Sequence, residues 1–486
     1  MRLRLRGVWA VAAFAATVSY GMGFGSAAGA QMLARPGWVG SGLSNEIWWK
    51  HPVVYEIDVR HFRDSNGDGV GDLKGVAEKL DYVQSLGADA ILLDGMEAPA
   101  GQGAPAGGPV TDRLIDPALG TFDDFDQLSQ EASRRNIRVL LNVVEPDLGI
   151  ARFWLNHGVA GFHVVAATAE EPRIAVGPKA SPEDLRKLLG SFSGQRILVG
   201  DAADAGAAQL VVEPLGNQEE MSAAKVRALL EPVVAQEKAA NAKAGSAKGV
   251  KGAGWPMVAE AMARSGNAGH DAAHDAAMAK LVGTVLLGTR SAALLADGRE
   301  LGLGSGVLIP WGENPVKVET PVDAGEGAPA APVPPPAPKP AESDVYVPYV
   351  PPKPKPKPWV PPAGSVAAQD GDPQSVLSFY RQLSQLHRGT GAMHDGETIL
   401  LDHDAEDVLA WVRRPKAITP LSPAVVVLCN LSDKPVTLSL KVETTKMGIR
   451  GSFLRPLLRS DSGLGAMDLE SMTLAPYQVY IGAVKY

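Results

Sequence analysis

Short apolar runs alternate with amphipathic runs along the first two-thirds of the chain, from residue 50 to about residue 310. Nearly continuous apolar strands that alternate with helices predict a parallel sheet covered on both faces. The number of strand–helix units favours an α/β fold of the closed (β/α)8 type, a TIM barrel, over an open sheet. The predicted strands cover residues 53–59, 90–96, 138–144, 161–167, 196–202, 208–215, 255–262 and 291–298, and the predicted helices cover 75–87, 122–136, 151–157, 181–192, 217–244 and 276–288.

The last third of the chain changes character twice. Residues 319–365 are rich in proline and cannot form a core, so we expect an extended, semi-rigid arm there. Residues 366–390 contain SVLSFYRQLSQLHR, whose apolar positions have helical spacing, and are predicted to form the last barrel helix. Strand-like runs such as VLAWVRR and PAVVVLCNL then predict a C-terminal antiparallel β-sandwich over residues 391–486. The barrel domain is expected over residues 45–318.

The first 30 residues are typical of a signal peptide. Three arginines precede an apolar stretch, VWAVAAFAATVSYGMGF, and Ala28-Gly29-Ala30 offers a cleavage site before Gln31. An uncleaved membrane anchor is the alternative, although the apolar stretch is short for a full span. We therefore expect an exported protein, periplasmic or extracellular, with no membrane span after signal cleavage.

Net charge and cysteine content exclude other classes of protein. The net charge of -8 argues against a nucleic-acid partner. Cys429 is the single cysteine, so no intrachain disulfide can form. It lies in the apolar run VVVLCNL, which predicts a buried thiol rather than a nucleophile.

Oxygen-bearing side chains alternate in the stretch DSNGDGVGD, residues 64–72. Gly69 permits a sharp turn, as in the first part of an EF-hand loop, but Gly75 stands where an EF-hand needs glutamate. Carboxylates held this close repel one another without a cation, so Ca²⁺ is the predicted cofactor. An Asx-rich turn without an ion is the alternative. The predicted side-chain ligands are Asp64, Asn66, Asp68 and Asp72.

The region around this loop resembles the start of the alpha-amylase family. WWKHPVVYEIDVRHFRDSNGDGVGDLKGVAEKLDYVQSLGADAILL is most similar to its alpha-glucosidase and oligo-1,6-glucosidase branch, glycoside hydrolase family thirteen. The likeness continues through IDPALGTFDDFDQLSQEASRRNIRVLLNVV and then weakens, while covering most of the mature chain outside the proline-rich arm. The resemblance implies a role in carbohydrate metabolism and a calcium site after the first strand, with the carbonyl of Val70 as a further ligand.

The resemblance also assigns the catalytic positions. The family hydrolyses alpha-glucosidic bonds with retention, which needs a carboxylate nucleophile and a second carboxyl group about 5 Å away. The nucleophile belongs to a G-F-R-x-D motif after the fourth strand. This chain has GFHVV there, so His163 takes the arginine position and Val165 the nucleophile position. The acid/base position, in ILVGD, is Asp201, one methylene shorter than the family's glutamate.

A third carboxylate clamps the sugar in the family, within an N-H-D motif after the seventh strand. This chain has GNAGHD, so either Asp271 keeps the role with His270 beside it, or the position falls on Gly269. His163 and His270 are the candidate substrate-binding residues. The plainer interpretation is that the two aspartates cap helices and the two histidines lie at the barrel rim.

Two substrate-holding loops are also altered. The loop after the second strand, GQGAPAGGPVTD, lacks the family's Tyr-Asp pair. After the third strand, VVEPDLG follows Asn142 and runs almost directly into the next helix. We therefore expect the barrel to lack the substrate-covering excursion at this point.

Three functional hypotheses follow. The first is an exported pseudoenzyme, catalytically impaired or inactive, which binds alpha-glucan or an oligosaccharide. The second is an active hydrolase that uses Asp201, Asp271 and a third carboxylate, Glu145 or Asp204. The third is a cell-envelope scaffold whose proline-rich arm contacts an envelope partner. The first is favoured because the nucleophile, the sugar-holding loop and the covering excursion are all changed together.

Overall fold

The computed structural model describes residues 47–97, 114–166, 178–215, 221–244, 254–259, 271–304, 306–313, 360–401 and 405–485. All of them lie in one unit, Ile47–Tyr486. The predicted signal peptide, His270, Gly269 and most of the proline-rich arm fall outside the described residues. No helix in the described ranges is long and apolar enough to cross a membrane.

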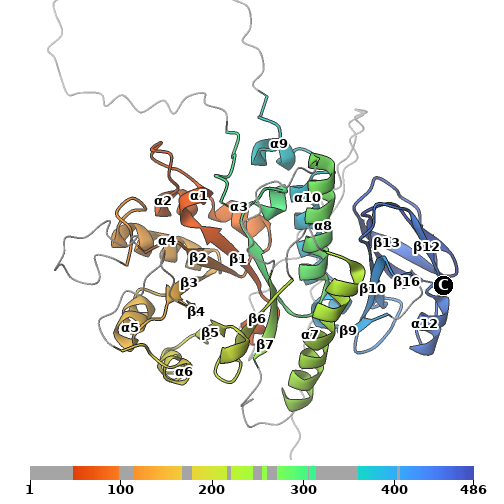
Figure 1. Ribbon diagram of the computed structural model, residues 1–486, viewed down its shortest axis with the longest axis horizontal. Helices are drawn as coiled ribbons and strands as arrows, with labels where there is room; N and C mark the ends of the chain where they lie inside the picture. Colours follow the sequence, from red (N-terminus) through yellow and green to blue (C-terminus); the bar gives the residue numbers. More distant parts are fainter. Residues whose placement is uncertain are drawn as a thin grey trace, which may run out of the picture. The chain divides into compact units, whose positions relative to one another are not determined.

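Eight parallel strands follow one another in sequence order and close into a barrel, because the eighth strand pairs with the first (Figure 1). The predicted TIM barrel is confirmed. The strands are β1 (Val53–Asp58), β2 (Ala90–Asp94), β3 (Arg138–Val144), β4 (Gly161–Val165), β5 (Ile197–Gly200), β6 (Leu210–Pro214), β7 (Trp255–Ala259) and β8 (Ala292–Ala296).

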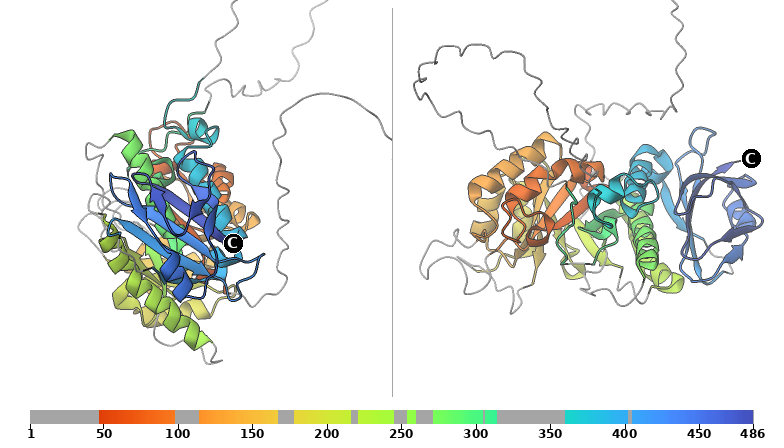
Figure 2. Two further views of the ribbon diagram at one scale, coloured as in Figure 1. Left: turned by 90° about the vertical axis from the view of Figure 1, so that its right-hand side faces the viewer. Right: turned by 90° about the horizontal axis from the view of Figure 1, so that it is seen from above.

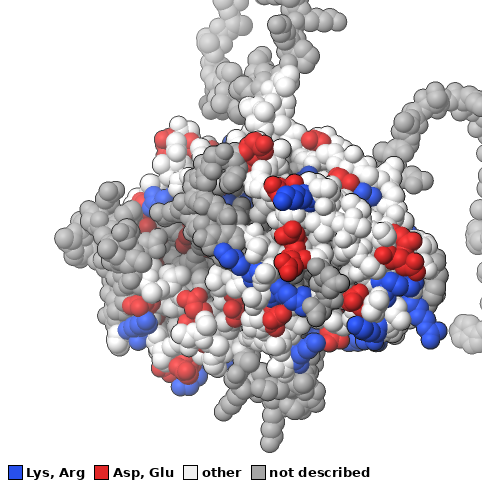
Figure 3. Space-filling view, turned by 45° about the vertical axis from the view of Figure 1, so that its right-hand side comes forward, with Lys and Arg blue, Asp and Glu red and all other residues white. Residues whose placement is uncertain are grey.

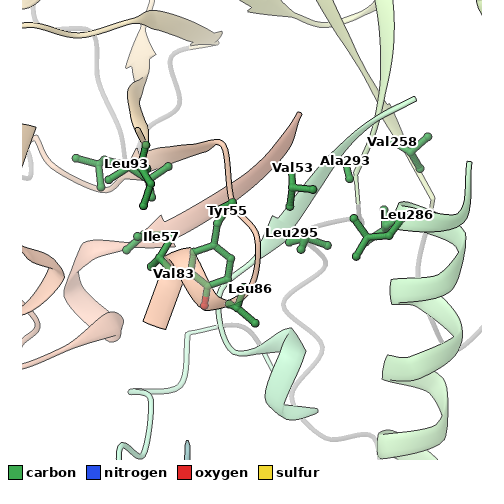
Figure 4. Close-up of a cluster of buried hydrophobic side chains, with 14 of the residues drawn as sticks. Val53, Tyr55, Ile57, Val83, Leu86, Leu93, Val258, Leu286, Ala293 and Leu295 are labelled. Carbon is green, nitrogen blue, oxygen red and sulfur yellow. The ribbon is translucent and has the colours of Figure 1, made fainter. Parts of the chain in front are cut away.

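Both faces of these strands are buried, which explains why they read as continuous apolar runs. Val53, Tyr55 and Ile57 of β1 face outward and pack in one cluster with Val83 and Leu86 (Figure 4). The alternate residues point into the barrel and form a second cluster. This interior cluster contains Val54, Ala90, Leu92, Leu140, Ala160, Ile197, Val199, Leu210, Trp255, Met257, Ala259, Ala292 and Leu294.

Helices connect the strands and lie around the barrel (Figure 2). Several begin where a side chain caps the free backbone N–H groups; Thr121 and Asp124, for example, form a reciprocal capping box at one start. The helices are α1 (Val59–Phe62), α2 (Leu73–Glu78), α3 (Leu80–Ser85), α4 (Phe122–Arg134), α5 (Leu148–Asn156), α6 (Pro182–Gly190), α7 (Ala223–Ala244), α8 (Ala272–Gly288), α9 (Val366–Asp370) and α10 (Val376–Gly389).

The connection from β3 to α5 is very short. Only Glu145, Pro146 and Asp147 separate the two elements, and Asp147 already caps α5 by accepting hydrogen bonds from Gly149 N and Ile150 N. The expected absence of a substrate-covering excursion at this point is therefore confirmed.

The C-terminal part is antiparallel, as predicted. A six-stranded sheet has the order β14-β13-β16-β11-β10-β9, and a two-stranded sheet joins β12 to β15. Its elements are α11 (Gly391–Asp395), β9 (Glu397–Leu400), β10 (Val408–Arg414), β11 (Val425–Asn430), β12 (Val436–Leu438), α12 (Lys441–Lys446), β13 (Phe453–Arg459), β14 (Met467–Asp468), β15 (Met472–Leu474) and β16 (Val479–Lys485).

Sequence patterns gave an imperfect account of this sheet. The run VTLSLKV ends as a strand at Leu438, and its last residues begin α12. The strand β13 was not expected, because Pro456 and exposed Arg455 interrupt its apolar pattern. It forms by pairing with β16, with a register shift between Pro456 and Leu458 that accommodates the proline. Cys429 is fully buried on β11, as predicted, and burial raises the pKa of its thiol.

Trp411 of β10 joins this sheet to α8. Its side chain is fully buried, and its Nε1 donates a hydrogen bond to the carbonyl of Gly288 at 2.9 Å. A Cβ atom on Gly288 would lie 2.6 Å from Trp411 Cζ2, so the helix needs glycine where the indole packs against it.

We therefore expect Trp411→Ala to lower the free energy of unfolding by about 3–5 kcal/mol, because it removes a large buried side chain and a hydrogen bond. Urea denaturation followed by circular dichroism measures this change. Leu421→Ala is the control, since Leu421 is 99% exposed. Equal unfolding midpoints for the two variants would contradict this account of the junction.

Candidate functional site at the carboxyl end of the barrel

Polar side chains replace the apolar interior at the carboxyl ends of the first, third and fourth strands. Glu56 and Asn142 come two residues after Val54 and Leu140 on their strands, and Val54 and Leu140 belong to the interior cluster. Residues two apart on a strand lie on the same face, so Glu56 and Asn142 also face the interior of the barrel. His163 lies on β4 level with Asn142, its Cα partner on β3. In TIM barrels the loops at this end carry the chemistry, so the polar residues here define the candidate site.

Three of these side chains are joined by hydrogen bonds and approach a fourth. Asn142 Nδ2 donates to Glu56 Oε1 at 3.2 Å, and Asn142 Oδ1 lies 2.8 Å from His163 Nδ1. His163 Nε2 in turn lies 3.9 Å from Asp201 Oδ1. We call Glu56, Asn142, His163 and Asp201 the interior polar chain.

The direction of these hydrogen bonds places a proton on Nδ1 of His163. Because the Asn142 amide nitrogen donates to Glu56, the amide oxygen is left to accept a hydrogen bond from His163 Nδ1–H. The other ring nitrogen, Nε2, is buried and has no hydrogen-bond partner within the described residues. His163 therefore directs a free ring nitrogen towards the carboxylate of Asp201.

Glu56 is the most deeply buried member of the chain, with 3% of its surface exposed. Burial, with a smaller contribution from the charge of Asp94, raises the pKa of Glu56 to about 7; His163 and the hydrogen bond from Asn142 act in the opposite direction. Near neutral pH this buried carboxyl group is therefore partly protonated.

Asp201 differs from Glu56 in both exposure and charge. It follows β5 at the start of a short 3-10 helix, Ala202–Asp204, and its side chain is 71% exposed without capping that helix. The nearby ring of His163 lowers the pKa of Asp201. A carboxyl group with a lowered pKa is ionised at neutral pH and has no proton to donate to a leaving group.

Val165 is two residues beyond His163 on the same face of β4. It lies at the carboxyl end of the strand beside Val144, and its carbonyl accepts a hydrogen bond from Glu145 N at 3.1 Å. The position that the resemblance assigns to the nucleophile therefore lies at the carboxyl end of β4, and its side chain is an isopropyl group instead of a carboxylate.

Asp271 lies apart from the interior polar chain. It is exposed and caps α8, where its Oδ1 accepts a hydrogen bond from His274 N at 2.7 Å. Within the described ranges no hydrogen bond or ion pair joins it to Asp201. The plain interpretation as a helix cap therefore describes Asp271 but not Asp201.

Neither of the other two carboxylates considered for hydrolysis joins the chain. Glu145 has a positive φ of 40° and pairs with Lys179 Nζ at 2.7 Å. Asp204 lies in the 3-10 helix after β5, and its backbone N–H donates to the carbonyl of Asp201.

Further acidic residues behind the site hold the fold together. Glu300 is buried and accepts hydrogen bonds from the hydroxyls of Tyr55 at 2.8 Å and Tyr82 at 2.5 Å. Burial raises the pKa of Glu300 and, together with Asp58, that of neighbouring Asp297. Asp58 itself caps α1 and contacts His61 Nδ1 at 2.7 Å.

The loop after β1 holds its own turn through its carboxylates. Asp64 accepts hydrogen bonds from the backbone N–H groups of Asn66, Gly67 and Gly69, which lower the pKa of Asp64. Gly67 and Gly69 have φ values of +84° and +94°, a region that favours glycine. Asp68 accepts from Val70 N at 2.8 Å in the same way.

Asp72 plays a different part in this loop. It is 5% exposed, caps α2 through Gly75 N, and accepts two hydrogen bonds from Ser65. In the described parts of the chain, no three His, Cys, Asp or Glu side chains converge to hold a metal ion. The oxygen donors suit Ca²⁺ chemically, but calcium would depend on Asn66 and the Val70 carbonyl as well as on the carboxylates.

Comparison with known proteins finds a family that is similar to the first part of this barrel. Residues 56–158 match the family described as "Alpha amylase, catalytic domain". This segment runs from Glu56 to the end of the turn after α5, and over it the chain is similar to the catalytic domain of the alpha-amylase family.

Known relatives are similar to segments of comparable length. The oligo-1,6-glucosidase of Heyndrickxia coagulans is 42% identical over 99 residues, which are 20% of this chain and 17% of that enzyme. The glucan 1,6-alpha-glucosidase of Streptococcus pneumoniae is 43% identical over 101 residues, 20% of this chain and 18% of that enzyme. Over this segment the chain is similar to the alpha-glucosidase-like branch, and it spans less than a fifth of the length of either relative.

Solved structures extend the likeness in fold. The isomaltulose synthase of Klebsiella sp. LX3 superposes with a TM-score of 0.60 over 91% of this chain and 100% of that structure, at 16% sequence identity. At this identity the likeness concerns the architecture: a closed barrel followed by an antiparallel sheet.

The sequence did not single out Glu56 as part of a site. It lies inside the apolar run VVYEIDV, where it reads as one residue of a strand. Its place two residues after Val54, on the same face of the strand, could have indicated a polar site, because a charged residue that faces the interior of a closed barrel requires a partner.

We expect Glu56→Gln to flatten the pH dependence of stability. A carboxyl group whose pKa is raised to about 7 on folding binds its proton more tightly in the folded state, so stability falls as pH rises from about 4.5 to about 7. The fall amounts to on the order of 3 kcal/mol at most. Glutamine keeps the acceptor for Asn142 and has no proton to lose.

Urea denaturation of both proteins between pH 4.5 and 8 measures this effect. The difference between them should grow in favour of Glu56→Gln as pH rises. Glu470→Gln, at an exposed position in the C-terminal sheet domain, is the control and should follow the unmutated protein. Parallel curves for unmutated protein and Glu56→Gln would show that Glu56 does not titrate in this range.

Proposed function

We propose that this protein is an exported member of the alpha-glucosidase-like branch that does not hydrolyse alpha-glucosidic bonds and that binds alpha-glucan at the carboxyl end of its barrel. The observation that carries the proposal is the identity of the residues at the two catalytic positions, Val165 and Asp201. One position of the retaining pair has no carboxylate, and the other has a carboxylate whose pKa is lowered.

Retaining hydrolysis needs both groups in complementary states. The nucleophile must be ionised and the acid must hold a proton at the working pH. Val165 cannot form a glycosyl intermediate, and Asp201 is ionised beside His163. Glu56 holds a proton near neutral pH but is 3% exposed, so a bound sugar cannot reach it.

Binding makes smaller demands than hydrolysis. Sugar hydroxyls donate hydrogen bonds to carboxylates and accept them from ring N–H groups. Asp201 is exposed, His163 is held in one orientation by Asn142, and Val165 offers an apolar contact beside them. The short β3–α5 connection supports an open site, because no long excursion follows β3.

Hydrolysis is tested with the mature protein lacking residues 1–30, supplied with calcium, on p-nitrophenyl alpha-glucoside and maltotriose. We expect no turnover above that of Asp201→Asn, because the nucleophile position is Val165. Turnover that is lost in Asp201→Asn would mean that an active site was rebuilt around Asp201, and would establish the alternative of an active hydrolase.

Isothermal titration of the same protein with maltooligosaccharides tests the binding half of the proposal. We expect heat of binding that is lost or weakened in Asp201→Asn and retained in Asp407→Asn, the same change at an exposed position of the C-terminal sheet domain. A flat titration of folded protein would overturn glucan binding and leave a scaffold role.

Calcium is proposed as a stabilising ion for the loop after β1. Asp64, Asn66, Asp68, Asp72 and the carbonyl of Val70 would hold it, where the cation would relieve repulsion between carboxylates. We expect calcium to raise the melting temperature of the unmutated protein and of Asp433→Ala, but not of Asp68→Ala. Asp433 is exposed and lies in the C-terminal sheet domain. No calcium response in the unmutated protein would exclude the site.

A further inference from the structure

A pocket lies where the barrel meets the C-terminal sheet. Its volume is about 750 Å³, within the range of small-molecule sites. Lys50 and Arg290 reach it from the residues before β1 and β8, at the amino ends of the barrel strands. It therefore lies at the opposite end of the barrel strands from the interior polar chain. We call it the basic pocket; its basic residues are Lys50, Lys238, Arg290, Arg414 and Lys416.

Positive charge predominates in this pocket. Five basic side chains line it, against the two carboxylates of Asp395 and Glu397. Glu397 is paired with Lys238 at 3.5 Å, and Asp395 contacts His394 Nδ1 at 3.1 Å. In the part of the chain that the structure describes, Lys50, Arg290, Arg414 and Lys416 form no ion pair. On the face drawn in Figure 3, Lys and Arg side chains are interspersed with Asp and Glu side chains.

Two of these cations are held against one aromatic ring. Lys50 Nζ lies 5.8 Å and Arg290 Cζ 5.5 Å from the ring centroid of Trp255, which is 3% exposed. The backbone of Arg290 is fixed on both sides, since its N–H donates to Thr398 Oγ1 and its carbonyl accepts from His51 Nδ1. Two like charges are therefore placed together by the packing of the barrel and the sheet.

The charges behind the pocket do not cancel this excess. Arg413 is fully buried and adds a further positive charge, with hydrogen bonds to backbone carbonyls and to Thr398. The buried carboxyl of Glu237 faces Arg413 and Arg290, but burial raises the pKa of Glu237 to about 7. At neutral pH it therefore supplies only part of a negative charge. Burial and the charge of Arg290 also lower the pKa of Lys50.

We propose that the basic pocket binds a small molecule that carries phosphate groups. Arginine offers planar pairs of N–H donors and lysine a compact positive charge, and both are the usual partners of phosphate oxygens. A ligand with several negative charges suits an excess of three cations better than a single carboxylate does. The Arg290 Nε atom is buried without a partner in the described structure. This inference does not depend on the proposed function of the opposite end.

The test is isothermal titration of the full chain with inorganic pyrophosphate at constant ionic strength. Orthophosphate, glucose 6-phosphate and chloride are titrated in parallel, so that a site for a phosphorylated sugar is distinguished from one for phosphate alone. The pocket variant is Lys50→Gln with Arg414→Gln. The matched control is Lys446→Gln with Arg450→Gln, the same change of charge at exposed positions outside the pocket.

We expect binding of at least one phosphate compound, weakened about tenfold or more in the pocket variant and unchanged in the control, because each charge-assisted hydrogen bond contributes enough for such a factor. Equal weakening in both variants would mean that only net charge matters, and would overturn the proposal. So would no binding of any phosphate compound. Circular dichroism shows whether the pocket variant folds. If it does not, Lys416→Gln replaces it, because Lys416 is exposed, and the same weakening of phosphate binding is expected.

Discussion

The pairing of β8 with β1 is the contact on which the rest of this structure depends. Val53 lies opposite Ala293 and Val54 opposite Leu294, and this ladder closes eight parallel strands into a barrel. Closure divides every strand into residues that face the surrounding helices and residues that face a water-free interior. Apolar residues satisfy both environments, whereas a polar interior residue must find its partner on another strand.

The interior polar chain is the consequence of that constraint. Glu56 cannot reach water, so Asn142 donates to it, and the same amide accepts from His163. The orientation of His163 then determines the state of Asp201 at the surface. A buried group on β1 is thus connected to an exposed group after β5 through two side chains. The arrangement stabilises an ionised Asp201 and opposes its use as a general acid.

The two ends of the barrel have acquired different chemistry. At the carboxyl end, the short β3–α5 connection and Val165 leave a site with a few fixed polar groups. At the amino end, the junction with the C-terminal sheet brings together Lys50, Arg290 and Arg414, which come from separate segments. The junction itself is held by apolar packing, such as Trp411 against α8. Packing energy therefore keeps these like charges close together.

The sequence by itself determined the barrel, the order of its strands and the short connection after β3. These features follow from apolar periodicity and from the number of residues between successive apolar runs, which can be read along the chain without knowledge of its tertiary contacts. It also placed Val165 and Asp201 at strand ends, since each directly follows or ends an apolar run. It could not determine β13, whose proline is tolerated only because β16 pairs around it. Nor could it determine the interior polar chain or the basic pocket. Their residues are far apart in the sequence, and only closure of the barrel and docking of the sheet bring them within contact distance.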